Sequence, residues 1–176
     1  MNFCSHCGAV VQLVHLPNDA LPRYVCATCA AIHYQNPKMV TGCVVYRQNR
    51  VLLCKRAIEP CFGMWNLPAG YLENGETAEK GAMREVWEEA HAEVSIQGLH
   101  CIYSIPRINQ VYLIFLASLN NLQFSPTSES SEVALFSETE INWNEIAFTS
   151  SVFALKHFFS DLREGTARVH IGSFTG

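Results

Sequence analysis

Three glutamates near the middle of the chain have the types and spacing to hold a divalent cation. Residues 84–89 read Arg-Glu-Val-Trp-Glu-Glu. On an α-helix with Glu85 at 0°, Glu88 falls at about −60° and Glu89 at about +40°. The three carboxylates then share an arc of roughly 100°, and Mg²⁺, a hard cation, prefers such oxygen ligands. Geometry alone leaves a second interpretation open, because a solvated acidic helix face has the same pattern.

The helix that must position these glutamates is predicted by its flanking residues. Thr77 is a suitable N-cap, Glu79 in the first turn faces the positive helix end, and the helix runs to about Ala90. Apolar residues gather on the side away from the glutamates: Ala82, Met83, Val86 and Ala90. The helix is therefore amphipathic, with one face for a core and one anionic face.

Strand-like runs surround this helix in the sequence. Two of them are joined by a polar turn at residues 48–50 and are typical of a hairpin. Thr149 is expected to cap a last helix, which Gly165 would end. The expected strands cover residues 39–46, 51–55, 93–96, 98–104, 111–117 and 133–136.

Composition limits the classes of function. The chain has 176 residues, 49% hydrophobic and 16% charged, enough for one buried core and a small appended module. The formal net charge is −4 and the mean hydropathy is +0.08, with none of the basic field that a general nucleic-acid binder needs. No signal-peptide pattern and no apolar window of roughly 18 residues is found. We expect a cytoplasmic protein without membrane or nucleic-acid partners.

Four of the eight cysteines form two close pairs that suit one tetrahedral metal site. Cys4 and Cys7 form the first Cys-x-x-Cys pair, Cys26 and Cys29 form the second, and 18 residues separate the pairs. We expect structural Zn²⁺, with iron or vacant thiols as the alternatives. The metal would supply folding energy, because about 35 residues make too small a core by themselves. His6 and His33 are expected at the surface rather than among the ligands.

The region before the glutamates resembles a known motif. Gly70, five residues, Glu76, seven residues and then residues 84–89 are similar to the Nudix box, here spanning residues 70–92. The preceding segment 63–70 also resembles the usual strand-to-loop entry of that family. One departure is His91, where the family usually has glycine; histidine can adopt the left-handed conformation at a cost of roughly 1 kcal/mol.

The resemblance implies an α/β fold: a Nudix-type α/β/α sandwich with a mixed sheet over residues 39–176, preceded by a small zinc ribbon over residues 1–38. It also implies that Glu85, Glu88 and Glu89 ligate catalytic Mg²⁺ or Mn²⁺, with the Gly70 carbonyl near the metal. Arg84 would orient the carboxylates. Glu76 would anchor the loop to the helix rather than take part in the chemistry.

In the family the general base is often a glutamate outside the box, on a loop facing the helix. Glu129 and Glu132 are the candidates here, alongside Glu85 itself. We prefer Glu132, because it adjoins a predicted strand and would be held more rigidly. Bound metal would neutralise the pyrophosphate oxygens and lower the pKa of the attacking water.

The substrate is less constrained by the sequence. A ribbon before a Nudix domain resembles the NADH pyrophosphatases and a group active on FAD or ADP-ribose, in which the ribbon is structural or forms a homodimer. The Ser-Gln-Pro-Trp-Pro-Phe-Pro motif of the NADH enzymes is absent, and Pro106, 14 residues past Ala92, is suggestive of the ADP-ribose group. We expect cleavage of ADP-ribose or FAD to AMP and a second phosphate product.

Three alternatives stay open: hydrolysis of NADH, hydrolysis of nucleoside triphosphates, and a non-enzymatic nucleotide-sensing regulator. Binding of nucleic acid by the ribbon is disfavoured, because Arg23 and Lys38 against Asp19 leave residues 1–38 with a net charge of only +1. Aromatic residues that could stack on a base or flavin ring, although each also suits the core, are Tyr103, Tyr112, Phe115 and Phe148.

Overall fold

The computed structural model describes residues 1–175, which divide into two compact units, one over Met1–Asn36 and the other from Pro37 onward. The first unit is a three-stranded antiparallel sheet in the order β1-β2-β3, with β1 at Val11–Val14, β2 at Arg23–Cys26 and β3 at Ile32–His33. Its small core contains Cys4, Val11 and Cys26. A core of this size agrees with the expectation that a metal stabilises the unit.

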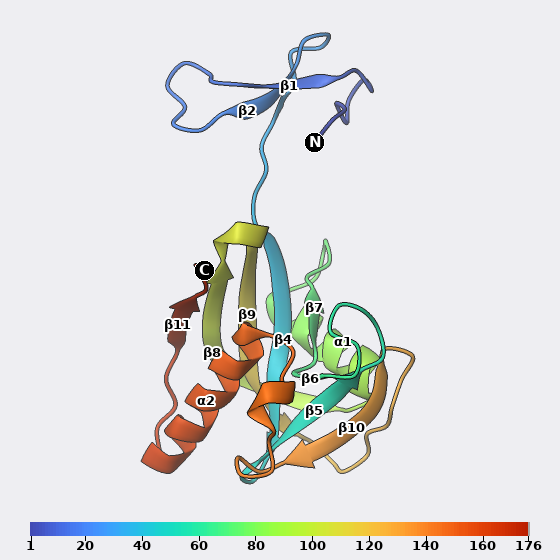
Figure 1. Cartoon of the computed structure of the whole chain (residues 1–176), viewed down its shortest axis with the longest axis vertical. Helices are drawn as coiled ribbons and strands as arrows, with labels where there is room; N and C mark the ends of the chain where they lie inside the picture. The colour runs from blue at the N-terminus through green and yellow to red at the C-terminus, as the bar shows by residue number, and fades with distance from the viewer. Residues whose placement is uncertain (176) are drawn as a thin grey trace. The chain divides into compact units, whose positions relative to one another are not determined.

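The second unit is built on one mixed sheet in the order β10-β5-β4-β9-β8-β11, with two short strands, β6 and β7, paired to β5 and β4 (Figure 1). Strand β4 pairs in parallel with β9 and antiparallel with β5. The strand bounds are β4 Lys38–Arg47, β5 Arg50–Arg56, β6 Trp65–Asn66, β7 Ala69–Tyr71, β8 Val94–Ile105, β9 Gln110–Leu119, β10 Ser130–Phe136 and β11 His170–Ser173.

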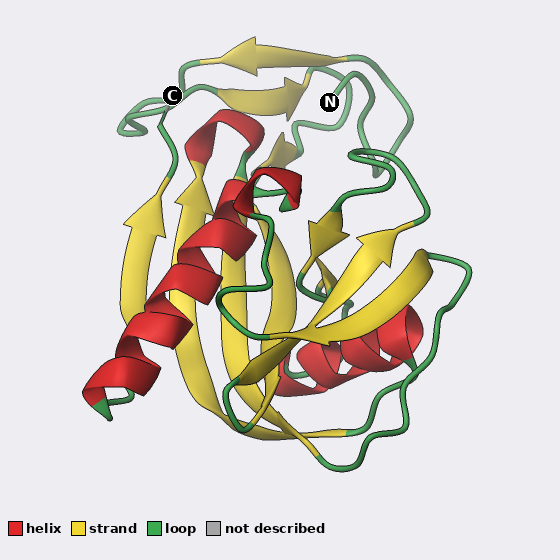
Figure 2. Cartoon of the chain, turned by 60° about the horizontal axis from the view of Figure 1, so that its bottom comes forward, coloured by secondary structure: helices red, strands yellow, loops and turns green. Residues whose placement is uncertain are grey.

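The central strand β4 explains why the sheet needs cover on both faces. Six consecutive residues of β4 are buried, so side chains that alternate between the faces are shielded on each. Helix α1 (Ala78–Ala90) packs over one core cluster, around Val45 and Val86, and helix α2 (Thr149–Glu164) over another, around Val44 and Leu155. Figure 2 shows one helix on each side of the sheet. The predicted α/β/α sandwich with a mixed sheet is confirmed.

Several local predictions are also confirmed. The β4–β5 hairpin pairs Tyr46 with Val51, and Thr77 caps α1 by accepting a hydrogen bond from the Lys80 N–H at 3.3 Å. His91 ends α1 in the left-handed conformation at φ 47°, and its N–H donates to the Trp87 carbonyl at 2.8 Å. A hydrogen bond of 3.0 Å between the His91 Nδ1 and Ser125 Oγ holds the ring. Histidine therefore takes the place of the usual glycine without breaking the turn.

Other local predictions need correction. Thr149 is the first residue of α2 rather than its cap; Phe148 is the N-cap and makes no side-chain capping bond. The expected strands 93–96 and 98–104 are one strand, β8, which begins at Val94. Register shifts on either side of Gly98 interrupt its pairing with β9 and explain the apparent break in the sequence pattern. Strand β11 was not predicted. Two 3₁₀ turns, Pro106–Ile108 and Trp143–Glu145, complete the unit. Within residues 1–175 there is no helix with the length and apolar character needed to cross a membrane.

Candidate active site

Helix α1 turns two of its glutamates inward. Glu85 and Glu89, four residues apart, keep only 9% and 6% of their surface exposed, while Glu88 lies on the solvent side. The apolar residues Ala82, Val86 and Ala90 hold the helix against the sheet, which fixes the direction of the acidic face. Two buried carboxylates on one face are costly unless a cation or several hydrogen bonds compensate them.

Arg84 supplies part of that compensation. Its guanidinium donates to Glu76 at 2.8 and 3.1 Å, to Glu85 at 2.7 Å and to Glu88 at 2.8 Å. A fifth bond reaches the Tyr71 carbonyl at 3.1 Å, and thus joins the helix to strand β7. Glu76 also accepts from the Glu73 N–H at 2.8 Å, so its carboxylate links the loop to α1. Arg84 therefore holds three carboxylates and the loop before the helix in one network.

The burial of Glu89 is offset less than that of Glu85, which accepts a hydrogen bond from the charged Arg84. Among the residues that the structure describes, the Glu89 carboxylate accepts one hydrogen bond, from the Ala69 N–H at 3.0 Å. Beside it, the Glu85 carboxylate packs so closely on Gly70 that a Cβ added there would overlap both carboxylate oxygens. Ala69 and Gly70 belong to β7, so the strand and the two buried glutamates form one wall of the site.

Burial raises the pKa of both glutamates. For Glu89 the loss of solvent, strengthened by the negative charge of Glu85, raises the pKa to about 8. For Glu85 burial also raises the pKa, against the opposing effect of Arg84. A divalent cation bound at these two carboxylates would stabilise their ionised forms and lower both pKa values.

The ligand atoms of Glu85, Glu88 and Glu89 do not all lie within 4.8 Å of one another. In the described part of the chain, the clusters whose ligand atoms all lie within 4.8 Å are the four cysteines and a group of His100, Asp161 and His170. Arg84 draws Glu85 and Glu88 toward itself, whereas Glu89 turns to Ala69. The oxygen-rich donor set fits Mg²⁺ or Mn²⁺. Arg84 binds one oxygen of Glu85 and one of Glu88, so the other oxygen of each carboxylate is not bonded to Arg84.

The two loop glutamates differ in their relation to α1. Glu132 on β10 is exposed, and its carboxylate lies 3.5 Å from Lys55 Nζ on the adjacent strand β5. Glu129 lies where its negative charge adds to the effect of burial in raising the pKa of both Glu85 and Glu89. A shift in strand register lies between Ser130 and Glu132, so the two glutamates stand on opposite sides of this irregularity along the chain. Glu132, preferred from the sequence as the general base, thus lies in a strand as expected and is paired with Lys55, and its role stays a prediction.

A cleft of about 430 Å³ begins at Ala69 and Gly70. Arg56 lies on its wall, with the guanidinium 5.1 Å from the ring centre of Phe148, and its positive charge also acts on Glu89. The polar groups of the cleft include Gln110, which donates to the Tyr71 hydroxyl and accepts from the Tyr112 hydroxyl, each at 2.9 Å. Apolar walls with a few fixed polar groups are typical of small-molecule sites.

Of the four aromatic candidates, the cleft contains two. Tyr112 and Phe148 line it, whereas Tyr103 and Phe115 are buried in the body of the second unit. Arg56 and Arg107 line it as well and were not predicted. A weak signal existed for Arg56, which ends a strand-like run, but only the fold shows that this strand end faces β7.

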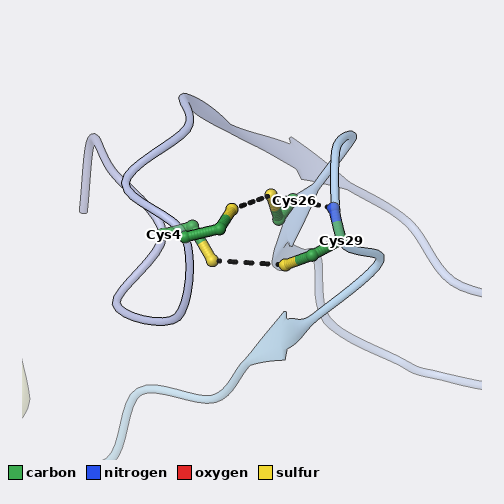
Figure 3. Close-up of side chains that lie close together, drawn as sticks. Cys4, Cys26 and Cys29 are labelled. Atoms are coloured by element: carbon green, nitrogen blue, oxygen red, sulfur yellow. Dashed lines mark hydrogen bonds between the residues drawn. The ribbon is translucent and has the colours of Figure 1, made fainter.

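The cysteine pairs face one another in the first unit (Figure 3). Cys4 Sγ lies 3.6 Å from Cys29 Sγ, and Cys7 Sγ lies 3.5 Å from Cys26 Sγ. Four sulfurs at about 2.3 Å from one zinc would stand roughly 3.8 Å apart, so a tetrahedral ion fits. The fit accords with the predicted four-cysteine site.

The two loops repeat one geometry. Gly8 and Ala30 both have positive φ, 74° and 59°, and their N–H groups donate to the carbonyls of Cys4 and Cys26, each at 2.9 Å. Backbone N–H groups also point at the sulfurs, and that of Cys29 is the main cause that lowers the pKa of Cys26 to about 6, which favours the thiolate. His33, expected at the surface, is instead buried, with Nε2 3.3 Å from Cys4 Sγ; it contacts a cysteine from outside the group of four.

Comparison with protein families assigns both units. A family model described as "NUDIX domain" matches residues 36–155, and one described as "Nudix N-terminal", a Nudix zinc ribbon, matches residues 2–35. Together they cover residues 2–155 of the 176.

Known proteins extend this similarity. The chain is 31% identical over 126 residues to the NAD-capped RNA hydrolase NudC of Chromobacterium violaceum, covering 70% of this chain and 45% of that one. It is 27% identical over 107 residues to the ADP-ribose pyrophosphatase of Methanocaldococcus jannaschii, covering 58% and 63%. The chain thus spans less than two thirds of these relatives.

A crystal structure of a NUDIX hydrolase from Nitrosomonas europaea superposes with a TM-score of 0.95 at 50% identity, covering 99% of each chain. An ADP-ribose pyrophosphatase from Streptococcus suis superposes with a TM-score of 0.61 at 20% identity, covering 79% of this chain and all of that one. At that lower identity the likeness concerns the fold alone.

Proposed function

The chain belongs to the Nudix family, with a zinc ribbon module in front of the Nudix domain, and on that premise we propose that it is a metal-dependent pyrophosphohydrolase of ADP-ribose or FAD. The observation that supports this most is the continuity of the site. The cleft of about 430 Å³ reaches Gly70, against which the carboxylate of Glu85 packs. A substrate in the cleft can therefore present its pyrophosphate to the acidic face of α1.

In this proposal Glu85, Glu88 and Glu89 hold Mg²⁺ or Mn²⁺, with the Gly70 carbonyl nearby. When bound, the metal would neutralise negative charge on the pyrophosphate oxygens and lower the pKa of the attacking water. Arg84 keeps Glu85 and Glu88 in place from the solvent side. Water adds to one phosphorus, the bridging P–O bond breaks, and AMP leaves with ribose 5-phosphate or FMN.

Glu129 is proposed as the general base that takes the proton from the attacking water. Its negative charge contributes to the raised pKa of both Glu85 and Glu89, which supports a position near the acidic face of α1. Glu132 becomes the less favoured candidate, because its carboxylate forms an ion pair with Lys55.

The cleft residues suggest how the substrate is held. Arg56 has charge to offer a phosphate and lies over Phe148, so one end of the cleft combines a cation and an aromatic face. Tyr112 and Gln110 offer hydrogen bonds further along. This pairing suits a nucleoside diphosphate joined to a second polar group, and the Methanocaldococcus relative named as an ADP-ribose pyrophosphatase supports the same class.

A second candidate is hydrolysis of NADH or of an NAD-type pyrophosphate, favoured by the similarity to a NAD-capped RNA hydrolase. To separate the candidates, the purified full chain is incubated with Mg²⁺ and, in turn, ADP-ribose, FAD, NADH and nucleoside triphosphates. Release of AMP from ADP-ribose or FAD at the highest kcat/KM is expected. A preference for NADH or triphosphates would overturn the substrate assignment. A folded, metal-loaded chain that hydrolyses none of them would favour the regulator and overturn the enzyme assignment.

We also propose that Zn²⁺ in the ribbon is structural and that the chain forms a homodimer through this unit. Large apolar side chains lie exposed on the ribbon, among them Phe3, Val10, Leu13, Leu21 and Tyr34. Several large apolar side chains exposed on so small a unit favour an interface. Light scattering of the wild-type chain and of Leu13→Ser tests it: a dimer that becomes a monomer in the variant is expected, and a monomeric wild type would contradict the proposal.

A further inference from the structure

A second group of metal-binding side chains lies in the Nudix domain, away from the acidic helix. His100 on β8, Asp161 near the end of α2 and His170 on β11 place one ligand atom each within 4.8 Å of the others. The group lies on the α2 side of the sheet, whereas the acidic helix α1 packs on the other core cluster (Figure 1). Neither the Nudix mechanism nor the zinc ribbon uses any of these residues.

The surroundings of His100 indicate which ring nitrogen is available. Its Nε2 lies 2.9 Å from the Ala154 carbonyl, which can only accept, so Nε2 carries the proton. Its Nδ1 then carries no proton and has a lone pair available. The residue is fully buried, and Nδ1 has no hydrogen-bond partner among the residues that the structure describes. A buried nitrogen without a partner is rare in a folded protein. Histidines that ligate metals show this arrangement: one nitrogen donates to a backbone carbonyl and the other faces the ion.

The other two side chains are already drawn together. His170 Nε2 lies 2.8 Å from Asp161 Oδ2, and the Asp161 side chain is 8% exposed. Asp161 Oδ2 also accepts a hydrogen bond of 3.3 Å from the Arg168 N–H. A buried anion between two imidazoles is a suitable seat for a divalent ion.

Two neighbouring side chains, Arg168 and His157, contact this cluster. Arg168, whose Nε lies 3.9 Å from Asp161 Oδ1, is drawn outward by its ion pair with Glu164. His157 stacks on His170, with ring centres 4.0 Å apart and planes at 21°, which fixes the orientation of the His170 ring without adding a nitrogen to the cluster. His170 is itself partly exposed, so an ion has a path from solvent.

We propose that His100, Asp161 and His170 form a further metal site that takes a divalent ion of the zinc class. Imidazole and carboxylate ligands suit Zn²⁺, with a water completing the coordination. Ligand atoms about 2.0–2.2 Å from one tetrahedral ion stand roughly 3.4 Å apart, so the three groups need only small movements. Because the ligands come from β8, α2 and β11, the ion would fasten the edge strand β11 and the end of α2 to the sheet.

The test is a titration of the full chain, purified with its ribbon zinc in place, with Co²⁺ and Zn²⁺ in excess Mg²⁺ that saturates the α1 carboxylates. We expect an additional equivalent of metal beyond the four-cysteine site. Its Co²⁺ spectrum will show d–d bands without the thiolate charge-transfer band of the cysteine site, and bound Zn²⁺ will raise the melting temperature. His170→Asn and Asp161→Asn should weaken this binding by at least about tenfold.

The matched control is His157→Phe, which keeps a ring stacked on His170 and should retain the additional equivalent. A wild-type chain that binds no metal beyond the ribbon and the α1 site would overturn the proposal, as would a His170→Asn variant that binds as tightly as His157→Phe. If a ligand variant fails to fold, nitrogen NMR of the wild-type histidines decides instead. A Zn²⁺-induced shift of the His100 Nδ1 resonance supports the site, and an unchanged resonance contradicts it.

Discussion

The Glu89 carboxylate accepts a hydrogen bond of 3.0 Å from the backbone N–H of Ala69, the residue directly before Gly70. This bond ties the buried side of α1 to β7, the strand that opens onto the cleft. It also leaves Glu89 with a single hydrogen bond for a side chain that is 6% exposed. The carboxylate of Glu89 is therefore buried with little to offset the loss of hydration.

Replacing Glu89 by glutamine removes a proposed metal ligand while keeping the side-chain volume. We expect Glu89→Gln to lower kcat on the order of 100-fold or more, because charge stabilisation by the metal is lost. The fold should stay intact, as judged by circular dichroism. Glu79→Gln is the matched control on the exposed first turn of α1 and should retain nearly full activity. Unchanged turnover in Glu89→Gln would remove this residue from the mechanism.

Stability of the chain without catalytic metal should depend on pH through Glu89. Its pKa is about 8 in the folded chain against an ordinary value of 4.5, so between these values the folded state holds a proton that the unfolded state releases. The free energy of unfolding therefore falls as pH rises through this window, with a Glu89 contribution approaching about 1.4 kcal/mol per pH unit.

Urea unfolding between about pH 5.5 and about pH 7.5 measures this slope. Glu89→Gln should show a shallower decline, since the variant has no proton to release. Added Mg²⁺ should raise the stability of the wild type most at the alkaline end, where it binds the ionised carboxylate. Equal slopes in wild type and variant would contradict the assignment.

Glu129 and Glu132 offer a matched pair for the general base. We expect Glu129→Gln to reduce kcat roughly 100-fold at neutral pH, within the range for loss of a proton acceptor. Glu132→Gln should have a small effect, because its carboxylate is exposed and paired with Lys55. The pH profile of kcat should lose its acidic limb in Glu129→Gln alone. The reverse order of effects would restore Glu132 as the base.

Arg84→Lys keeps the positive charge but cannot bond Glu76, Glu85 and Glu88 at once. We expect a loss of about 1.5–3 kcal/mol in the free energy of unfolding, the range for hydrogen bonds to charged groups. We also expect a fall of roughly tenfold in kcat/KM as the carboxylates lose their orientation. Arg163→Lys is the control, since its ion pair with Glu138 is exposed and should contribute less than about 1 kcal/mol. Equal effects of the two variants would argue against the network.

Removing a ribbon cysteine should remove one zinc. Cys4→Ser is expected to lower the zinc content of the purified chain by one equivalent and to unfold the first unit, because its core contains only a few residues besides the cysteines. Cys61→Ser, which alters a free cysteine outside the ribbon, should leave the zinc content unchanged. Elemental analysis by mass spectrometry measures both. Full zinc retention in Cys4→Ser would exclude the four-cysteine site.

The family and the two modules could be predicted from the sequence because their signals are local. An α-helix repeats every 3.6 residues, so the spacing of Glu85, Glu88 and Glu89 determines their common face before any tertiary contact forms. Two Cys-x-x-Cys loops likewise specify a four-sulfur cluster, and Thr77 and His91 bound the helix as expected. These features need only neighbouring residues.

The tertiary structure decided what depends on strand register and on segments distant in sequence. Glu132 lies opposite Lys55 because β10 pairs with β5, whereas Glu129, just before β10, has a charge that raises the pKa of the buried α1 glutamates. Arg56 reaches the cleft because β5 ends beside β6 and the loop before α2. His100 and His170 meet because β11 pairs in parallel with β8, and no periodicity connects residues 70 positions apart. Such pairings are determined by packing of the whole sheet, whose register a single strand does not encode.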